Sequence, residues 1–315
     1  MSECRIMGDP RVCVIILNWN GLNDTLECLE SLRAISYCNY KVIVVDNGSE
    51  GNEAGVLSRR YGDYVSVIRN DENRGFAEGN NIAIRYALKH FDPAYFLLLN
   101  NDTIVDPEFL GIMVDEAQSD PSVGIMGSKV YFCADRNRLQ FAGGKIHRWT
   151  GGTEMTGCGK IDHGQFDNTR ESDWVLGCSL LAKRAVTERI GLLYEGYFSY
   201  FEEADWCVRC REAGFRVVWT PRARIWHKGA RSVNKVSGFQ IRYMTRNRFL
   251  FVKRNSTWTQ YLVFVVWFFL ALCPLTTVSL LFKSRDIRAI RTFYGAVCEG
   301  LRMSPGERRP KKAGC

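Results

Sequence analysis

Four short, largely apolar runs punctuate the first hundred residues, and each ends abruptly in polar side chains. They cover residues 12–17, 41–45, 64–68 and 95–99. Runs of this length without a polar face are typical of β-strands that are covered on both sides. Between them, residues 22–32 and 76–88 are predicted to be helices. This alternation predicts an α/β fold with a doubly wound, mostly parallel sheet.

The composition fits a folded protein with an anionic partner. Of the 315 residues, 46% are hydrophobic and 24% are charged, which excludes a mainly disordered or fibrous chain. The net charge of +8 favours a nucleotide, an acidic lipid surface or a nucleic acid as partner. About +6 of that charge lies in residues 283–315, so the excess is concentrated near the C-terminus.

The turns that follow the four predicted strands are rich in asparagine and aspartate. They cover residues 18–20, 46–49, 69–75 and 100–102. Ligands of parallel sheets bind outside the carboxyl ends of the strands, so we expect a polar ligand site at this edge. The turns lack a G-x-G-x-x-G or Walker A pattern, which excludes a Rossmann dinucleotide site and a P-loop. The acidic edge also argues against nucleic acid, whose phosphates require Lys and Arg.

Asp102 closes a polar triplet at the end of the fourth strand. A single carboxylate in this position can hold Mg²⁺ or Mn²⁺ when a diphosphate and water complete the coordination shell. Such an ion would neutralise the charge on a departing nucleoside diphosphate. A purely structural turn is the alternative interpretation, and the placement at a strand end favours the metal site.

Four motifs together resemble the family 2 glycosyltransferases, and in particular their rhamnosyltransferase-like members. They lie at residues 13–21, 42–49, 73–81 and 97–102, within a similarity that runs from Arg11 to Ser232. The resemblance implies a GT-A fold and a dTDP-, UDP- or GDP-linked sugar as donor. It also implies a divalent cation, Mg²⁺ or Mn²⁺, and a single displacement that inverts the anomeric carbon.

The resemblance assigns roles on the donor side residue by residue. Asn18 and Asn20 would line the nucleoside pocket, and Asp46 would bond the base or ribose. Asn100 and Asp102 would take the outer places of the DXD motif, so Asn100 replaces its first aspartate and one carboxylate remains for the ion. The full set implied for donor binding is Asn18, Asn20, Asp46, Asn73, Arg74, Gly75, Asn100, Asn101, Lys228 and Arg231.

Three acids, Glu202, Glu203 and Asp205, stand within four residues at a predicted helix start. Acids at this position also stabilise a helix N-terminus, which is the purely structural alternative. An attacking hydroxyl needs a general base within hydrogen-bond reach. The family pattern Glu-Asp-x-Asp places that base at Glu203, with Glu202 as the fallback, whereas we expect Asp205 chiefly to pair with Arg209 one turn later.

His227 follows the strand predicted at residues 217–219. In family terms it matches the histidine that can complete the metal shell, and its neighbours Lys228 and Arg231 would reach the diphosphate. A neutral imidazole suits Mn²⁺ better than Mg²⁺. The stretch 131–170 is Gly-rich and is predicted to be a hairpin and a mobile loop without assigned chemistry.

Residues 259–282 form a stretch of 24 residues without a charge, long enough to span a bilayer. A buried core helix is the alternative, although such a helix normally has one polar face. Basic residues flank the stretch on both sides, and the positive-inside rule places both flanks in the cytoplasm. Either the tail crosses against that rule, or the stretch is re-entrant or in-plane and broken near Pro274, which we favour.

The sequence therefore predicts a membrane-attached, metal-dependent inverting glycosyltransferase whose catalytic domain lies on the cytoplasmic side. It would move a sugar such as rhamnose to a lipid-linked or growing surface glycan. The alternatives are a polyprenyl-phosphate sugar synthase of the same fold and a catalytically silent scaffold. The expected organisation is a tail (1–10), a GT-A domain (11–237, with halves 11–106 and 107–237), a basic juxtamembrane segment (238–258), the apolar segment (259–282) and a basic tail (283–315).

Overall fold

The four apolar runs form the parallel half of one large sheet. In the computed structural model, which describes residues 8–229, 238–284 and 287–306, they are β1 (Val12–Asn18), β2 (Tyr40–Asn47), β3 (Val65–Asn70) and β4 (Tyr95–Asn100). They pair in parallel in the order β3–β2–β1–β4. Strands β1, β2 and β4 are almost entirely buried, as their lack of a polar face predicts.

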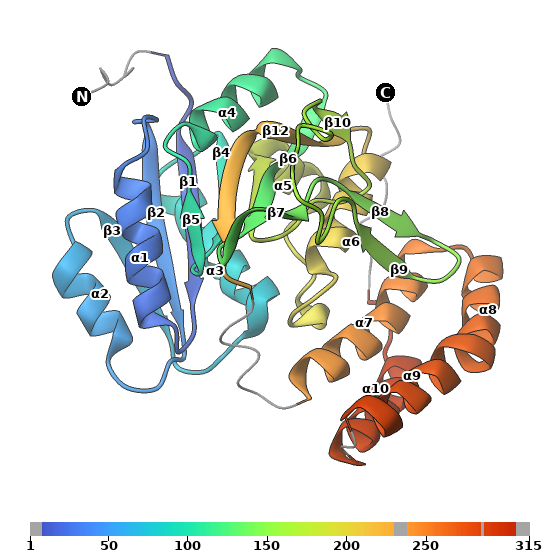
Figure 1. Ribbon diagram of the computed structural model, residues 1–315. Helices are drawn as coiled ribbons and strands as arrows, with labels where there is room; N and C mark the ends of the chain where they lie inside the picture. The colour runs from blue at the N-terminus through green and yellow to red at the C-terminus, as the bar shows by residue number, and fades with distance from the viewer. Residues whose placement is uncertain (1–7, 230–237, 285–286, 307–315) are drawn as a thin grey trace.

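Helices cover both faces of this half of the sheet. Helices α1 (Leu22–Arg33) and α2 (Glu53–Tyr61) lie on one face and α3 (Gly75–His90) lies on the other (Figure 1). The doubly wound arrangement is thus confirmed, and the predicted helices 22–32 and 76–88 are extended by only one or two residues at their ends. All four strands therefore deliver their carboxyl ends to the same edge.

The second half of the sheet is mixed. Beyond β4 the order is β11 (Ser179–Lys183), β6 (Val123–Phe132), β12 (Arg216–His227) and β10 (Arg170–Glu171). Strand β11 is antiparallel to both neighbours, whereas β12 is parallel to β6. The hairpin predicted within 131–170 is confirmed as β8–β9. The other elements are β5 (Thr103–Val105), α4 (Phe109–Ser119), β7 (Asp135–Phe141), β8 (Gly144–His147), β9 (Gly152–Met155), α5 (Arg184–Ile190), η1 (Glu195–Tyr197) and α6 (Glu202–Glu212).

Strand β12 is much longer than the predicted strand 217–219. The register of its pairing with β6 shifts between Thr220 and Arg224, around Pro221. Such an irregularity accommodates a proline that cannot donate to the ladder, so the strand continues where the sequence suggested an end. His227 is consequently the last residue of β12, opposite Thr103 of β5, and not part of a loop after the strand.

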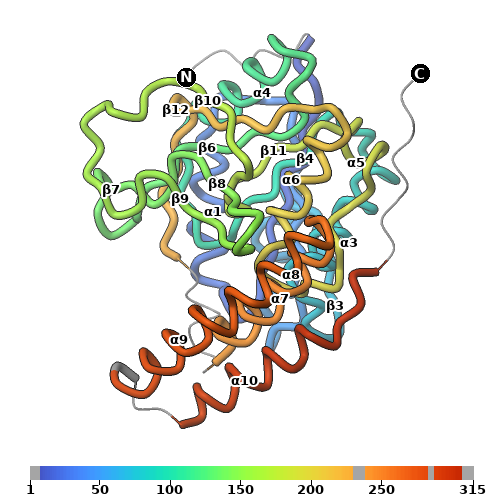
Figure 2. The backbone as a smooth tube through the Cα atoms, turned by 90° about the vertical axis from the view of Figure 1, so that its right-hand side faces the viewer, coloured from blue at the N-terminus to red at the C-terminus, as the bar shows by residue number. Residues whose placement is uncertain are grey.

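Four α-helices and two π-helical turns follow residue 238 among the described residues. Helix α7 (Phe239–Asn255) leads into α8 (Trp258–Trp267), the π-helical turn η3 (Phe268–Leu272), α9 (Cys273–Ser279) and a second π-helical turn, η4 (Leu280–Ser284). Helix α10 (Ile287–Arg302) is the last helix in the described part of the chain. These helices share a small core of their own, which includes Phe249, Phe264 and Phe293. In Figure 2 the α8–α9 segment leads away from the α/β part and α10 returns toward it.

One helix, Trp258–Phe282, is long and apolar enough to cross a membrane. It is not interrupted at Pro274, which lies in the first turn of α9. The hydrogen-bond pattern widens to the π-type just before the proline, and Figure 1 shows the helix bending between α8 and α9. The predicted break is therefore a bend in a continuous helix.

Candidate active site

Asp46 presents an unpaired carboxylate oxygen at the end of β2. Its Oδ1 accepts from the Ser49 amide at 3.2 Å, while its buried Oδ2 has no hydrogen-bond partner among the described residues. Asn18 is fully buried beside it and fully engaged: its Nδ2 donates to Glu53 Oε2 at 2.8 Å and its Oδ1 accepts from Thr25 at 2.7 Å. Asn18 therefore connects Glu53 to Thr25 and has no free polar group for a ligand. Asp46 Oδ2 remains available as an acceptor for a ligand.

The loop of residues 73–75 is shaped by Asn47, which the sequence analysis did not single out. Asn47 Nδ2 donates to Asn73 Oδ1 at 2.9 Å and to the Gly75 carbonyl at 3.1 Å, and its Oδ1 accepts from the Arg74 amide at 3.1 Å. Gly75 has a φ of +78°, and a Cβ there would meet the Phe198 carbonyl oxygen at 2.5 Å. This position therefore requires glycine. The Arg74 side chain remains half-exposed above the loop, beside Glu72.

Asp102 and His227 meet where β4 and β12 end. Asp102 Oδ1 lies 3.0 Å from His227 Nε2, and Asn100 Nδ2 lies 3.3 Å from the same nitrogen. Asp102 Oδ2 is buried without a hydrogen-bond partner among the described residues. Burial alone would raise the pKa of Asp102, but the hydrogen bond and charge of His227 outweigh burial and hold that pKa below its usual range.

This pair fits a divalent cation that is completed by its ligand. The described residues contain no group of three or more His, Cys, Asp or Glu side chains placed to hold a metal ion. The 3.0 Å between the two ligand atoms is the spacing of neighbouring ligands with metal bonds of about 2.1 Å. The unpaired Asp102 Oδ2 adds a further acceptor at the site. Two protein ligands leave the remaining positions to diphosphate oxygens and water, as Mg²⁺ and Mn²⁺ prefer.

Gln140 of β7 orients the imidazole of His227. Its Oε1 lies 2.8 Å from His227 Nδ1. When a metal ion is bound, an Nδ1–H donated to this oxygen would leave the Nε2 lone pair for the ion, in place of the Nε2–H that Asp102 Oδ1 accepts without it. The sequence analysis missed Gln140, because it belongs to the stretch 131–170 and carries no motif. Only the pairing of β6 with β7 brings it to the histidine.

Two of the predicted diphosphate contacts, Lys228 and Arg231, remain predictions. The amine of Lys228 binds α1, where it pairs with Asp24 at 2.7 Å and with Glu27. Its reach to the diphosphate stays a prediction that requires these pairs to open. Arg231 lies outside the described residues. Asn101 likewise turns toward α1 and donates to Thr25 Oγ1 at 3.0 Å.

The segment just before α6 is strained and tightly held. Phe198, Tyr200 and Phe201 all have left-handed φ values, of 64°, 70° and 75°, which is costly for side chains of this size. Asn247 of α7 is fully buried and donates to three carbonyls of this segment, those of Tyr197, Ser199 and Tyr200, at 2.7–2.8 Å. Helix α7 therefore fixes the backbone from which the acids of α6 project.

Glu202 and Glu203 form a coupled pair of carboxyl groups at the start of α6. Burial raises the pKa of both, well above the ordinary value for Glu202 and to about 7 for Glu203, and the two groups share a hydrogen bond. Each keeps an Oε2 without a partner among the described residues. Burial thus favours the protonated form of Glu202, while a Glu203 with a pKa of about 7 can accept a proton near neutral pH, which is the property of a general base.

The pair faces the same part of the molecule as Asp102. Burial raises the pKa of the Cys178 thiol well above its ordinary value, and the negative charges of Asp102 and Glu203 both add to this rise. A Cβ at the neighbouring Gly177 would lie 3.7 Å from the Cβ of Glu203, and the Cys178 carbonyl accepts from the Asn100 amide at 3.1 Å. The structure brings the metal-binding and base candidates to one region.

Asp205 is held by ion pairs and hydrogen bonds that connect α6 to α7. Its predicted pairing with Arg209 is present at 2.8 Å, and its other oxygen accepts from Arg254 at 3.1 Å and from Asn255 at 2.9 Å. Burial opposes its charge, but Arg209 and Arg254 hold the pKa of Asp205 below its usual value. The carboxylate is fully buried and engaged, so it joins α6 to α7 and is not placed to accept a proton.

We expect Asp205→Ala to destabilise the protein by about 3–5 kcal/mol, because it leaves two buried guanidinium groups without their counter-ion. The matched control is Asp173→Ala, which removes a partly exposed carboxylate 2.6 Å from Arg211. The control should cost no more than about 1 kcal/mol. Chemical denaturation of both variants measures the difference, and equal losses would contradict the anchoring role of Asp205.

A family assignment follows from comparison with known proteins. The profile described as glycosyl transferase family 2 matches residues 13–186, which is more than half of the chain. The chain belongs to this family. The matched region contains Asp46, the loop 73–75 and Asp102, and it ends before Glu203 and His227. The resemblance stated from the motifs is confirmed.

Curated relatives of this glycosyltransferase include two enzymes of similar length. Rhamnosyltransferase WbbL of Escherichia coli is 24% identical over 78% of this chain and 93% of its own. The low-salt glycan biosynthesis hexosyltransferase Agl10 of Haloferax volcanii is 24% identical over 75% of this chain and 74% of its own. The protein y4gI of Sinorhizobium fredii is 32% identical over 70% of this chain, which spans only 24% of that relative.

Solved structures of GT-A glycosyltransferases share the fold. GalNAc-T7, solved with UDP, GalNAc and Mn²⁺, superposes with a TM-score of 0.63 at 14% identity, over 81% of this chain and 49% of its own. The mannosyltransferase PcManGT from Pyrobaculum calidifontis, solved with GDP-Man and Mn²⁺, gives 0.59 at 15% identity, over 94% and 88%. The GT-A fold expected from the sequence is thus confirmed.

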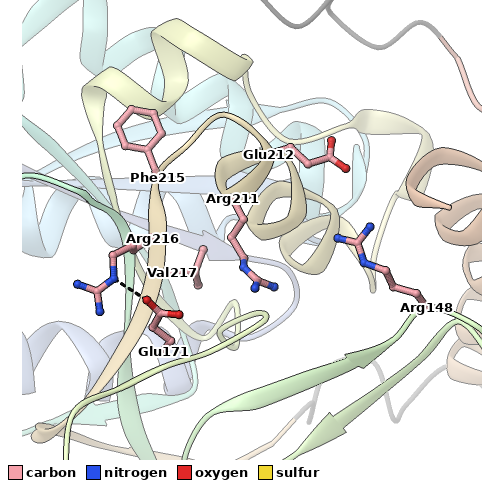
Figure 3. Close-up of a pocket in the computed structure, with 7 residues that line it drawn as sticks. All are labelled: Arg148, Glu171, Arg211, Glu212, Phe215, Arg216 and Val217. Atoms are coloured by element: carbon pink, nitrogen blue, oxygen red, sulfur yellow. Dashed lines mark hydrogen bonds and ion pairs between the residues drawn. The ribbon is translucent and has the colours of Figure 1, made fainter. Parts of the chain in front are cut away.

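A separate polar pocket of about 280 Å³ lies between α6, β12 and the β8–β9 hairpin (Figure 3). Its charged side chains are used in ion pairs and hydrogen bonds. Arg216 pairs with Glu171 at 2.7 Å, and Arg211 pairs with Asp173 at 2.6 Å. Arg148 donates to the Asn255 carbonyl at 3.4 Å. None of the predicted site residues lines this pocket, so it is not part of the candidate active site.

Proposed function

We propose that this family 2 glycosyltransferase moves a hexosyl or 6-deoxyhexosyl group from a nucleoside-diphosphate sugar to a hydroxyl of a lipid-linked or growing glycan, with inversion. The observation that carries the proposal is the approach of Asp102 to His227 at 3.0 Å in the same region as Glu203, whose pKa is raised to about 7. These are the groups that a metal-assisted single displacement requires. The rhamnosyltransferase and hexosyltransferase relatives support the sugar class.

The donor would bind along the carboxyl ends of β1, β2 and β4. Asp46 Oδ2 accepts a hydrogen bond from the nucleoside, and Arg74 lies at the rim of the loop 73–75. Mg²⁺ or Mn²⁺ held by Asp102 and His227 supplies charge neutralisation for the leaving diphosphate. GalNAc-T7 and PcManGT were solved with Mn²⁺ and with UDP or GDP-Man, which supports a divalent ion and a nucleotide donor.

Glu203 would act on the acceptor. The acceptor hydroxyl gives its proton to Glu203 as its oxygen forms a bond to the anomeric carbon. The bond between that carbon and the diphosphate oxygen breaks on the opposite face, so the configuration inverts. Glu202 keeps its own proton, because its pKa lies well above the ordinary value, and it donates a hydrogen bond that stabilises the ionised form of Glu203.

The catalytic part would comprise residues 11–237, with a nucleotide half at 11–106 and an acceptor half at 107–237. We place it on the cytoplasmic side of the cell membrane, where nucleotide sugars are available to it. The acidic edge keeps nucleic acid from being a partner, because the groups that would face its phosphates are Asp46, Asp102 and Glu203.

Release of nucleoside diphosphate tests the proposal. Detergent-purified protein is incubated with UDP-, GDP- and dTDP-sugars, with Mn²⁺ or Mg²⁺ and with polyprenyl-linked acceptors. We expect one donor to be preferred and release to stop when the divalent ion is chelated. A product formed on polyprenyl phosphate itself would change the acceptor class to that of a polyprenyl-phosphate sugar synthase. Absence of release from every donor in the presence of acceptor would contradict the proposal and favour a silent scaffold.

A further inference from the structure

The helix Trp258–Phe282 has one buried and one exposed apolar face. Phe264 and Phe268 are buried against α7 and α10. The exposed face carries Leu262, Val266 and Leu270 at four-residue spacing, and it continues through Leu275 to Phe282. Leu270 and Phe282 are 77% and 76% exposed. This helix is therefore not the core helix of a water-soluble bundle, because a contiguous apolar face is left in the open.

The chain that follows this helix returns to the catalytic part. Helix α10 lies beside α7: Arg242 pairs with Glu299 at 3.1 Å, and the Lys253 amine donates to the carbonyl of Met303 at 2.9 Å. Helix α7 is itself bound to the segment before α6 through Asn247. Both ends of the apolar helix are thus attached to the same water-soluble body, and a helix so attached cannot cross a bilayer.

The sequence between the apolar helix and α10 is charged, which argues against deep insertion. Residues 283–288 include Lys283, Arg285, Asp286 and Arg288. Charged side chains near the middle of a bilayer cost several kcal/mol each. A hairpin that dipped into the membrane would carry these residues to the greatest depth. The arrangement that avoids this lies flat along the surface.

Helix α10 provides a second face for the same surface. Ile287, Tyr294 and Leu301 recur every seven residues and are exposed, whereas Phe293 and Val297 are buried. Arg291 and Arg302 are exposed on the same helix. An exposed apolar stripe with neighbouring arginines is the pattern of helices that lie in the interface of an anionic membrane. Trp258, 71% exposed, begins the apolar helix with a residue enriched at membrane interfaces.

We propose that α8, α9 and α10 bind flat in one leaflet of an anionic bilayer, with the exposed apolar faces in the headgroup–acyl boundary, and that the chain does not span the membrane. The basic residues of 283–288 and of α10 select an anionic lipid surface over a second copy of the chain. The proposal concerns attachment and stands independently of the donor and the base. It would place α7, and the segment before α6 that Asn247 holds, next to the bilayer.

Vesicle flotation tests the docking surface. The full chain in mild detergent is diluted into preformed vesicles of phosphatidylcholine with or without phosphatidylglycerol. We expect binding to the anionic vesicles, weakened about tenfold or more by Leu270→Glu and not by Gln118→Glu, which adds the same charge on exposed α4. Arg291→Glu should weaken binding selectively on anionic vesicles, whereas Lys41→Glu, at the far end of β2, should not. Binding that ignores Leu270→Glu, or a dimer in light scattering that Leu270→Glu dissociates, would overturn the proposal.

Protease protection tests the topology. Epitope tags are placed at the two ends of the chain, and sealed membrane vesicles of both orientations are digested. We expect both tags to be removed from the same face, because residues before and after the apolar helix lie on one side. Removal of the tags from opposite faces would show a spanning helix and overturn the proposal, whatever the result for glycosyl transfer.

Discussion

Glu203→Gln should lower sugar transfer by about 10²–10⁴-fold, the usual contribution of a general base. Glutamine keeps the size of the side chain and its hydrogen bond with Glu202, but it cannot take a proton from the acceptor. Donor binding, measured as nucleotide affinity in the presence of Mn²⁺, should be unchanged, because the donor contacts lie on β1, β2 and β4. The expected signature is therefore a loss in kcat at constant donor affinity.

The pH profile separates this role from a structural one. The pKa of Glu203 is raised to about 7, so the side chain must lose its proton before it can act as a base. Transfer by the unmodified enzyme should rise with pH and level off above about 7. The residual transfer by Glu203→Gln should lack this rise. A rise that persists in the variant would assign the titration to another group.

Glu203→Gln should stabilise the folded protein although it lowers sugar transfer. The native Glu203 retains its proton up to about pH 7, whereas the unfolded chain releases it near the ordinary value of 4.5. Between these two values the native state binds more protons, so the free energy of unfolding falls as pH rises. Glu203→Gln removes this loss and should raise the melting temperature at pH 8 by roughly 2–4 °C. The same variant thus gains stability while it loses activity.

Glu202→Gln is the matched control. Glu202 is 4% exposed, and burial raises its pKa well above the ordinary value and so favours its neutral form. An amide in its place resembles the protonated carboxyl and still donates to Glu203. We expect a loss of transfer much smaller than that of Glu203→Gln. The opposite ranking of the two variants would move the base to Glu202.

The local sequence predicted the parts of the site that follow directly from strand ends. Asp46 and Asp102 lie where the apolar runs stop, so the periodicity of the runs was enough to place them at one edge. The sequence predicts His227 as a metal ligand, although the predicted strand 217–219 is much shorter than β12. The register shift of β12 after Thr220 depends on pairing with β6, which no local pattern reports.

The residues that support the site could not be predicted in the same way. Asn47, Gln140 and Asn247 are ordinary polar residues in sequence, and each acts through a partner 26 or more positions away. Asp205 was ambiguous for the same reason, because its ion pair with Arg254 joins helices 49 positions apart. The return of α10 beside α7 likewise depends on tertiary contacts, whereas the apolar helix before it was evident from composition.

Asp102→Asn should reduce transfer by about 10²–10³-fold, the scale for removing one group that stabilises developing charge. Asparagine retains the shape of the side chain and a hydrogen bond to His227, but it removes the only carboxylate of the triplet 100–102. A direct readout is binding of Mn²⁺ in the presence of nucleoside diphosphate, followed by the electron paramagnetic resonance signal of the free ion. That binding should be lost or greatly weakened.

Two further variants make the result specific. Asp106→Asn removes a nearby carboxylate that follows β5 and lies 3.7 Å from Arg224, and this variant should bind Mn²⁺ as the unmodified protein does. Gln140→Ala leaves both ligands in place and frees the imidazole to turn, so Mn²⁺ affinity should fall by about 10–100-fold. If Asp102→Asn binds Mn²⁺ as tightly as the unmodified protein, the ion does not bind at this edge of the sheet. The contact of Asp102 Oδ1 with His227 Nε2 at 3.0 Å would then join the two strand ends and would not mark a metal centre.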